Sequence, residues 1–231
     1  MPSTVTSVCV LCGHGNNQSL YKEYKPGAIQ LNQCVNCHQF IDKYIEYDRV
    51  ILLLDMFLLR IQSYRHLIFN YEISTSLLLR LLFVLLFCHG YIESCRYVAT
   101  TPSLIHLNFH LSLAMAFTEF GIICLTSFIA KGLLKIGHSK LDLNRFLRVI
   151  VLSHFIDYCS VIVTIWIHES YTPITILLLF YIPAQLQCYR ALFTDHWFKL
   201  LSVVLVQSII LKIANSIMFT RRAEFMDSFL S

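Results

Sequence analysis

Beyond position 70, the sequence is dominated by apolar runs that are long enough, or nearly long enough, to cross a lipid bilayer. A helix needs about 20 apolar residues to span a hydrocarbon core of about 30 Å. The run 107–130 is the strongest, because its 24 residues contain a single carboxylate, that of Glu119. The run 174–189 is the weakest, because it is short and contains Pro183, which favours a kinked or re-entrant segment. Five spans are predicted, with four or three also compatible with the pattern: 76–92, 107–130, 149–167, 174–189 and 200–219.

The composition agrees with a chain that faces lipid over much of its surface. Of the 231 residues, 56% are hydrophobic and 14% are charged, whereas soluble domains have about 45–50% and about 25%. A soluble single domain is therefore disfavoured. The net charge of +4 is too small to indicate nucleic-acid binding. Together with the apolar runs, these values predict an all-α multi-pass membrane protein.

Basic residues flank the predicted spans unevenly, and this asymmetry predicts the orientation of the chain. Short loops rich in Lys and Arg stay on the cytosolic side of a membrane. The region before the first span and the second loop are rich in basic residues, whereas the first and third loops together contain only Arg96. The N-terminus is therefore predicted to be cytosolic. With five spans the C-terminus lies on the opposite side, which fits Arg221 and Arg222 poorly, and with four spans it lies in the cytosol.

Four of the nine cysteines form two close pairs in the polar N-terminal stretch. Cys9 and Cys12 form one Cys-x-x-Cys pair, Cys34 and Cys37 form the other, and 21 residues separate the two pairs. This spacing is typical of two knuckles that present four thiolates to one tetrahedral zinc ion, and Gly13 permits the positive φ that such a turn requires. Such a closed site is structural, because no coordination position remains for a substrate.

Two other interpretations of these four cysteines remain open. They could form disulfides or a redox-active pair, although a reducing cytosolic side and the lack of a thioredoxin-like βαβ pattern disfavour both. Alternatively, His14 or His38 could replace one cysteine as a metal ligand. The remaining cysteines are scattered through or beside apolar segments and are interpreted as small hydrophobic residues: Cys88, Cys95, Cys124, Cys159 and Cys188.

The segment 47–69 lies between the cysteines and the first predicted span. Its apolar run of about 11 residues is interrupted by Asp55 and Arg60 and is too short to cross a bilayer. We expect one amphipathic helix over 47–69, either lying in the membrane interface or packed on the spans, or else an ordinary buried helix of a small cytosolic domain. The chain is accordingly divided into an N-terminal domain, 1–70, with its zinc module over 8–40, and a membrane domain, 71–231.

The N-terminal domain resembles a known family through an ordered succession of motifs. The two cysteine knuckles are followed by Ile41-Asp-Lys-Tyr-Ile-Glu-Tyr-Asp48, then by Ile51-Leu-Leu-Leu-Asp55, and then by Gln62-Ser-Tyr-Arg-His-Leu-Ile-Phe-Asn70. This succession, over about Val8 to Asn70, is similar to the homology domain of the Arv proteins. The resemblance leaves the individual roles of the matched acidic and aromatic positions open: Asp42, Tyr44, Glu46, Tyr47, Asp48 and Asp55.

The resemblance implies a membrane protein of the endoplasmic reticulum that acts in sterol and sphingolipid homeostasis, through intracellular sterol transport. It implies membrane lipids, and sterol in particular, as binding partners. Because the family is also linked to glycosylphosphatidylinositol, the alternative function is that of a non-catalytic accessory or scaffold subunit of a lipid-modifying enzyme complex.

Three ionisable residues lie inside predicted spans, where charge is costly and polar groups tend to line cavities: Glu119, His154 and Asp157. They could hydrogen-bond a sterol hydroxyl or a lipid headgroup, but pairing with one another or with Lys212, which would hold helices together, is favoured. The carboxylates of Asp42 and Glu46 lie one helical turn apart, a spacing that is common on solvated faces. Because the sequence contains no phosphate-binding loop, hydrolase nucleophile elbow or metalloprotease motif, enzymatic activity is not expected.

Overall fold

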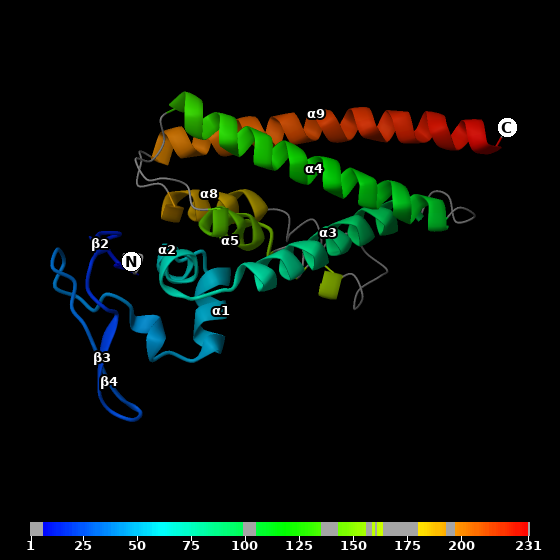
Figure 1. The fold of residues 1–231 in the computed structure, drawn as a ribbon. Coiled ribbons are helices and arrows are strands. Elements are labelled where there is room, and N and C mark those ends of the chain that lie inside the picture. Colours follow the sequence, from blue (N-terminus) through cyan, green and yellow to red (C-terminus); the bar gives the residue numbers. More distant parts are fainter. Residues whose placement is uncertain are drawn as a thin grey trace.

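The computed structural model describes residues 7–98, 105–134, 143–155, 159, 161–163, 180–192 and 197–230. Within these residues, a small N-terminal domain of two β-hairpins and short helices is followed by a helical region with three long helices (Figure 1). The predicted fold class, a multi-pass helical membrane protein with a small four-cysteine module at its N-terminal end, is confirmed.

The N-terminal domain begins with two antiparallel hairpins. Strand β1 (Ser7–Val8) pairs with β2 (Gly15–Asn16), and β3 (Tyr21–Lys25) pairs with β4 (Ala28–Leu31). The loop of the first hairpin carries the first cysteine pair, with Ser7 opposite Asn16 at its base. In the second hairpin Gly27 has a φ of 83°, which glycine adopts at little steric cost in a tight turn.

Short helices follow the hairpins. They are a 3₁₀ turn (Lys43–Ile45), α1 (Arg49–Phe57), α2 (Ile61–Arg65) and a π-helical turn (His66–Asn70). The prediction of one continuous helix over 47–69 is therefore wrong. The chain folds back between α1 and α2, and this reversal buries Tyr64 and Ile68 completely.

The break in the helix is a Schellman motif at the end of α1, in which two backbone N–H groups bond back to the carbonyls of the last turn. Leu59 has a left-handed φ of 54°, and its N–H donates to the Met56 carbonyl at 2.9 Å. The next N–H, that of Arg60, donates to the Asp55 carbonyl at 3.0 Å. The Tyr64 hydroxyl then donates to the Met56 carbonyl at 3.2 Å and holds α2 against α1.

Among the described residues, three helices are long and apolar enough to cross a membrane. They are α3 (Thr75–Val98), α4 (Ile105–Leu134) and α9 (Trp197–Leu230), with candidate spans over Thr75–Ser94, Phe109–Ile129 and Phe198–Arg221. These spans correspond to the predicted runs 76–92, 107–130 and 200–219. Helix α4 contacts both α3 and α9, and Figure 1 shows it lying between them.

Two shorter helices, α5 (Leu143–Ser153) and α8 (Tyr181–Leu192), also belong to the helical region. The predicted run 149–167 overlaps α5 as far as Ser153, and the run 174–189 overlaps α8 from Tyr181 onward. Much of both runs, including Asp157, lies outside the described residues. Pro183 lies in the first turn of α8, where its missing N–H removes no helical hydrogen bond.

Three apolar clusters connect these elements. The first joins α3, α4 and α5, and it contains Leu78, Leu82, Leu86, Ala116, Leu147, Ile150 and Val151. The second joins α2 and the π-helical turn to α5 and α8 through Tyr64, Ile68, Val149, Cys188 and Ala191. The third packs α8 on α9 through Tyr189, Leu200 and Val204. Because the second cluster spans both parts of the chain, the N-terminal domain packs directly on the helical region.

Candidate metal centre and buried polar networks

The first cysteine knuckle is the loop of the β1–β2 hairpin. The Cys9 N–H donates to the His14 carbonyl at 2.9 Å, and the Gly13 N–H donates to the Cys9 carbonyl at 2.9 Å. Gly13 has a φ of 78°, as the sequence predicts for this turn. A Cβ atom at this position would also lie 3.0 Å from the Arg65 guanidinium, so a larger residue would have to displace that side chain as well as adopt a left-handed backbone.

The second knuckle repeats the same hydrogen bonds at the same spacing. The Cys34 N–H donates to the Gln39 carbonyl at 2.8 Å, and the His38 N–H donates to the Cys34 carbonyl at 2.9 Å. His38 therefore occupies the position that glycine takes in the first knuckle, with a φ of 57°. Its exposed side chain is not part of the four-cysteine group, so within the described residues His38 contributes to the turn rather than to the ligand set.

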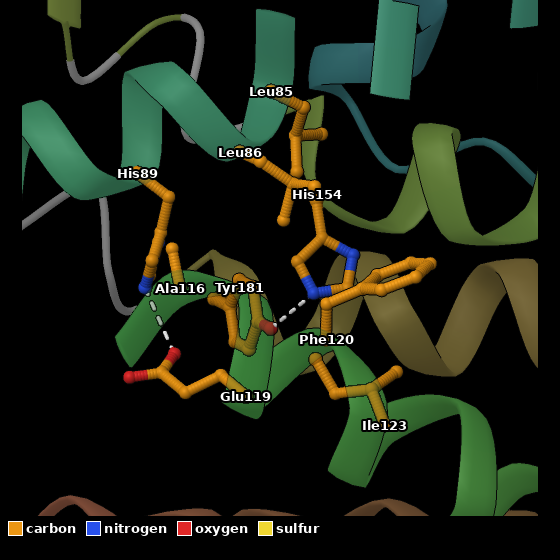
Figure 2. A pocket seen from close by; sticks show the side chains of 9 residues that line it. All are labelled: Leu85, Leu86, His89, Ala116, Glu119, Phe120, Ile123, His154 and Tyr181. Atoms are coloured by element: carbon orange, nitrogen blue, oxygen red, sulfur yellow. Dashed lines mark hydrogen bonds and ion pairs between the residues drawn. The ribbon is translucent and has the colours of Figure 1, made fainter. Parts of the chain in front are cut away.

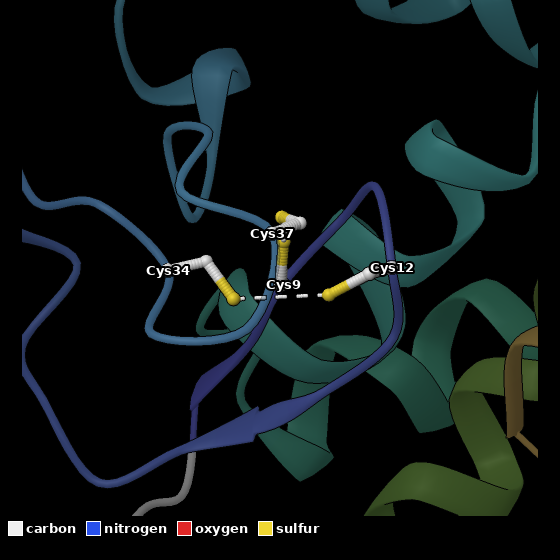
Figure 3. Close-up of side chains that lie close together, drawn as sticks. All are labelled: Cys9, Cys12, Cys34 and Cys37. Atoms are coloured by element: carbon white, nitrogen blue, oxygen red, sulfur yellow. Dashed lines mark hydrogen bonds between the residues drawn. The ribbon is translucent and has the colours of Figure 1, made fainter.

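The two knuckles bring four sulfur atoms together, all within 4.8 Å of one another (Figure 3). The Sγ atoms of Cys9 and Cys37 are 3.7 Å apart, and so are those of Cys12 and Cys34. A tetrahedral zinc site with Zn–S bonds of about 2.3 Å has sulfur–sulfur edges of about 3.8 Å, whereas a disulfide is about 2.05 Å long. The spacing thus fits four ligands of one metal ion and does not fit two disulfides.

Local hydrogen bonds favour a thiolate at Cys34. Burial tends to raise the pKa of this thiol, but N–H groups of Cys37 and Asn36 and the side chain of Asn16 outweigh it and lower the pKa to about 6. In contrast, burial raises the pKa of Cys9 to about 12. A bound cation would be needed to hold both sulfurs as thiolates at neutral pH, because thiolates are the metal-ligating form.

Asp42 lies at the centre of a buried polar network that connects the cysteine module to α2. It is fully buried, and its Oδ1 accepts a hydrogen bond from the Tyr44 N–H at 3.0 Å. Its Oδ2 lies 2.7 Å from Nδ1 of His66 and also accepts from Nδ2 of Asn70 at 2.7 Å. Three partners satisfy this buried carboxyl group, and it fixes the positions of the groups around it.

Asn70 continues this network to the first hairpin. Its Oδ1 accepts from the Val8 N–H at 2.9 Å, and its Nδ2 donates to the Val8 carbonyl at 2.9 Å. The amide side chain thus pairs with the backbone of β1 in the way that a neighbouring strand would. A second link comes from Arg65, whose Nη1 donates to the Val10 and Leu11 carbonyls at 3.1 and 2.7 Å. Both residues hold the first knuckle against α2 and the π-helical turn.

A second buried pair joins Tyr44 to α1. The Tyr44 hydroxyl donates to Oδ2 of Asp55 at 2.6 Å, and Oδ1 of Asp55 lies 3.3 Å from Nη1 of Arg60. Burial and the neighbouring carboxylate raise the pKa of Tyr44 above its ordinary value, so the hydroxyl remains a donor. Of the six matched positions with open roles, Asp42, Tyr44 and Asp55 therefore hold the domain together.

The other three matched positions lie at the edge of this network. Asp48 caps α1, since its Oδ1 accepts from the Val50 N–H at 3.4 Å. The Tyr47 ring packs edge-on against Tyr44 with ring centroids 5.8 Å apart, and Glu46 is exposed.

The sequence alone indicated no role for Arg65, His66 or Asn70, although all three belong to the motif Gln62 to Asn70. A signal in the sequence could have indicated their role. These polar residues interrupt a short apolar stretch that lies close to the cysteine module, where an ordinary lipid-facing segment is not expected.

Within the helical region, the polar side chains around Glu119 and His154 form two adjacent pairs (Figure 2). Nε2 of His89 on α3 lies 2.8 Å from Oε2 of Glu119 on α4, and Nε2 of His154 lies 2.6 Å from the Tyr181 hydroxyl on α8. Both pairs line one cavity of about 20 Å³. The expected partner Lys212 is exposed on α9, and Glu119 pairs with His89 instead.

Comparison with known proteins agrees with this arrangement. The model of the Arv1-like family matches residues 8–219. Protein ARV1 of Candida albicans is 49% identical over 63 residues, which cover 27% of this chain and 21% of that protein. Protein arv1 of Schizosaccharomyces pombe is 52% identical over 64 residues, with 27% of this chain and 24% of that protein covered.

A longer match extends beyond the N-terminal domain. Protein ARV1 of Bos taurus is 26% identical over 217 residues, which cover 87% of this chain and 76% of that protein. In contrast, the chain spans about a fifth to two fifths of the length of the Candida albicans and Dictyostelium discoideum relatives, 21% and 39%. No solved structure matches the chain. Because the family model covers most of the chain, including the four cysteines, the polar network around Asp42, helices α3 and α4, and α9 as far as Phe219, the chain belongs to the Arv1-like family.

Proposed function

We propose that this protein acts without enzymatic activity in sterol and lipid homeostasis, by handling sterol within the membrane of the endoplasmic reticulum. Family membership supports a role in lipid homeostasis, as the N-terminal motifs imply. The observation that carries the specific proposal is the intramembrane pair of His89 and Glu119, two hydrogen-bonding side chains held 2.8 Å apart between candidate spans. Polar groups at such a depth are costly and tend to serve a ligand or a partner.

The geometry suits a ligand with a single hydroxyl and a large apolar body. The cavity beside His89 and Glu119 has a volume of about 20 Å³, enough for one water molecule or one hydroxyl group. The rest of the ligand would lie on the apolar outer surfaces of α3 and α4, where Phe83 and Phe117 are about half exposed. In this proposal the hydroxyl bonds to the carboxylate of Glu119, and the ring system replaces lipid chains.

The N-terminal domain serves this function as a rigid cap held by zinc. Cys9, Cys12, Cys34 and Cys37 would supply four thiolates, and zinc would contribute structure rather than reactivity, because a closed four-sulfur site binds no substrate. In this proposal the cap is cytosolic and its helix α1 rests in the membrane interface. The exposed leucines of α1 support this placement, since Leu53, Leu54 and Leu58 are 54–64% exposed.

Direct sterol handling is tested by photo-crosslinking in nanodiscs. Purified full-length protein should be labelled saturably by a photo-reactive sterol, and the double variant His89→Phe with Glu119→Leu should lose most of the label. Because this variant removes both polar partners together, it leaves no unpaired charge in the membrane. Glu224→Gln, at a position whose side chain is 64% exposed near the end of α9, is the matched control and should label like the wild type.

Failure of saturable labelling would overturn direct sterol handling. If a stable protein partner were then recovered in mild detergent, the alternative role as a non-catalytic subunit of a lipid-modifying enzyme complex would replace it. The orientation has its own test, since Asn17 begins an Asn-Gln-Ser sequon and is exposed. Attachment of a glycan at Asn17 would contradict a cytosolic N-terminus, because N-glycans are added only on the lumenal side.

A further inference from the structure

A larger cavity, of about 330 Å³, lies at the junction between the N-terminal domain and the helical region. Four parts of the chain line it: Ser7 of β1, the loop that contains Gln18 and Ser19, the residues 68–72 at the boundary between the two domains, and the start of α5 with Asn144, Arg145 and Arg148. This volume is about ten times the share of one water molecule in the liquid, about 30 Å³. It therefore has room for a group of several heavy atoms.

The cavity lies where the first candidate span begins. Its residues 68–72 stand immediately before that span, which starts at Thr75. Nδ2 of Asn144 donates to Oγ1 of Thr75 at 3.0 Å, and this bond holds the start of α5 beside the start of α3. Since lipid headgroups lie directly outside the hydrocarbon core, a membrane crossed by this candidate span would have its headgroups at the level of the cavity.

Three charged residues line this cavity, and two of them, Arg145 and Glu72, have opposite charges and do not pair with each other. The guanidinium of Arg145 lies 5.2 Å from the centre of the Phe69 ring and, among the described residues, donates no hydrogen bond. Glu72 is exposed, and among the described residues its carboxylate forms no ion pair with Arg145. The neighbouring Arg148 differs, because its guanidinium donates to the backbone carbonyls of Leu67, Ile68, Tyr71 and Ile73.

We propose that this cavity binds the zwitterionic headgroup of a membrane phospholipid, with the phosphate at Arg145 and the ammonium group near Glu72. The planar guanidinium can present several N–H donors to phosphate oxygens, and it lies over the Phe69 ring, 5.2 Å from the ring centre. Gln18 and Ser19, in the loop between β2 and β3, add polar groups to the lining of the cavity. This site shares no residue with the sterol site beside Glu119, so each proposal can fail without the other.

The test is a titration of the full-length chain in maltoside micelles, followed by native mass spectrometry. The probes are dioctanoyl phosphatidylethanolamine, dioctanoyl phosphatidic acid, dioctanoylglycerol and free phosphoethanolamine. We expect saturable binding of phosphatidylethanolamine, weaker binding of phosphatidic acid, and none of dioctanoylglycerol at the same concentration. Displacement by phosphoethanolamine at concentrations equal to those of the lipid would assign the cavity to a soluble phosphate compound and overturn the assignment to a lipid.

Variants separate the two charges. Arg145→Gln should weaken the binding of phosphatidylethanolamine about tenfold, the effect of losing one charged hydrogen bond, and Arg145→Lys should retain most of it. Glu72→Gln should weaken the binding of phosphatidylethanolamine about two- to fivefold and leave the binding of phosphatidic acid unweakened. Arg221→Gln is the control, because Arg221 is 81% exposed on α9 and does not line the cavity.

Two results would overturn the proposal. One is unchanged affinity in Arg145→Gln, and the other is an equal loss in Arg221→Gln. Zinc content and thermal unfolding of each variant show whether the fold is intact. If Arg145→Gln does not fold, Glu72→Gln tests the proposal. A selective loss of phosphatidylethanolamine binding supports it, and an unchanged ratio between the affinities for the two lipids overturns it, because a purely structural role for Glu72 would leave that ratio unchanged.

Discussion

The N-terminal domain and the membrane helices differ in what connects their parts. In the N-terminal domain, several of the buried connecting groups are polar: Asp42 is fully buried and has three hydrogen-bond partners, and Asn70 pairs with the backbone of β1. In the helical region, the contacts between helices are mainly Leu, Ile and Ala side chains. The first part should therefore be sensitive to the loss of single polar atoms, and the second to changes in volume.

The difference follows from size and solvent. A domain of about 60 residues buries only a small apolar core and is marginally stable, so metal ligands and buried hydrogen bonds can contribute much of its stability. Helices in lipid gain little from the hydrophobic effect between them, and they associate through close packing. Gly90 on α3 illustrates this, because a Cβ atom there would lie 3.1 Å from the Cα of Leu113 on α4.

The largest effect should come from the cysteine cluster. Cys34→Ser removes one of four sulfurs, and we expect loss of bound zinc and unfolding of the N-terminal domain. A structural zinc site contributes about 10–16 kcal/mol, as much as the entire stability of a small domain. Zinc content and hydrogen exchange of residues 7–70 in the full-length protein measure this. Cys88→Ala, at a partly buried cysteine of α3 outside the cluster, should retain zinc; equal zinc in both variants would contradict a four-cysteine site.

The next effect tests the buried network. Asp42→Ala leaves His66 and Asn70 without their shared acceptor, and we expect the N-terminal domain to lose about 3–5 kcal/mol. Asp48→Ala is the matched control, because that exposed carboxylate only caps α1 and is worth about 1 kcal/mol. Hydrogen exchange in the N-terminal domain measures both values. Similar losses in the two variants would show that burial of Asp42 carries no special role.

How far the sequence predicts the structure differs between the same two regions. The four-cysteine cluster follows from local spacing, and the three long helices follow from the length of their apolar runs. The pairs across the fold could not be predicted, because they join residues that are distant along the chain. Asp42 and Asn70 are 28 positions apart, and His89 and Glu119 are 30 apart.

The break after α1 shows a second limit. A helix that ends in a left-handed residue normally has glycine there, and glycine is the signal by which such an end is recognised. Here the position is Leu59, with a φ of 54°. The sequence therefore looks continuous over 47–69, and the end of the helix is imposed by the return of α2 and the burial of Tyr64.

The membrane region should respond to volume instead. Gly90→Leu places a side chain against the backbone of Leu113, and we expect a loss of about 1–3 kcal/mol as α3 and α4 move apart. Gly121→Leu on α4 is the control, because a Cβ atom there meets nothing within 4 Å. Thermal unfolding of full-length protein in micelles compares the two. A loss in Gly121→Leu as large as that in Gly90→Leu would contradict close packing of α3 on α4 at Gly90.

The smallest effect is expected at Leu59. Variants at this position test whether tertiary contacts hold the backbone of Leu59 in a conformation that a leucine side chain disfavours. Leu59→Ala and Leu59→Gly both remove the side chain, but only glycine relieves the left-handed φ of 54°. That conformation costs a non-glycine residue about 1–2 kcal/mol, and the greater freedom of glycine in the unfolded chain offsets part of the gain. We expect Leu59→Gly to be more stable than Leu59→Ala by about 0.5–1 kcal/mol, measured by hydrogen exchange of α1 and α2. If alanine were the more stable, the helix would not end in this conformation in solution, and the N-terminal domain would be closer to the single helix that its sequence suggests.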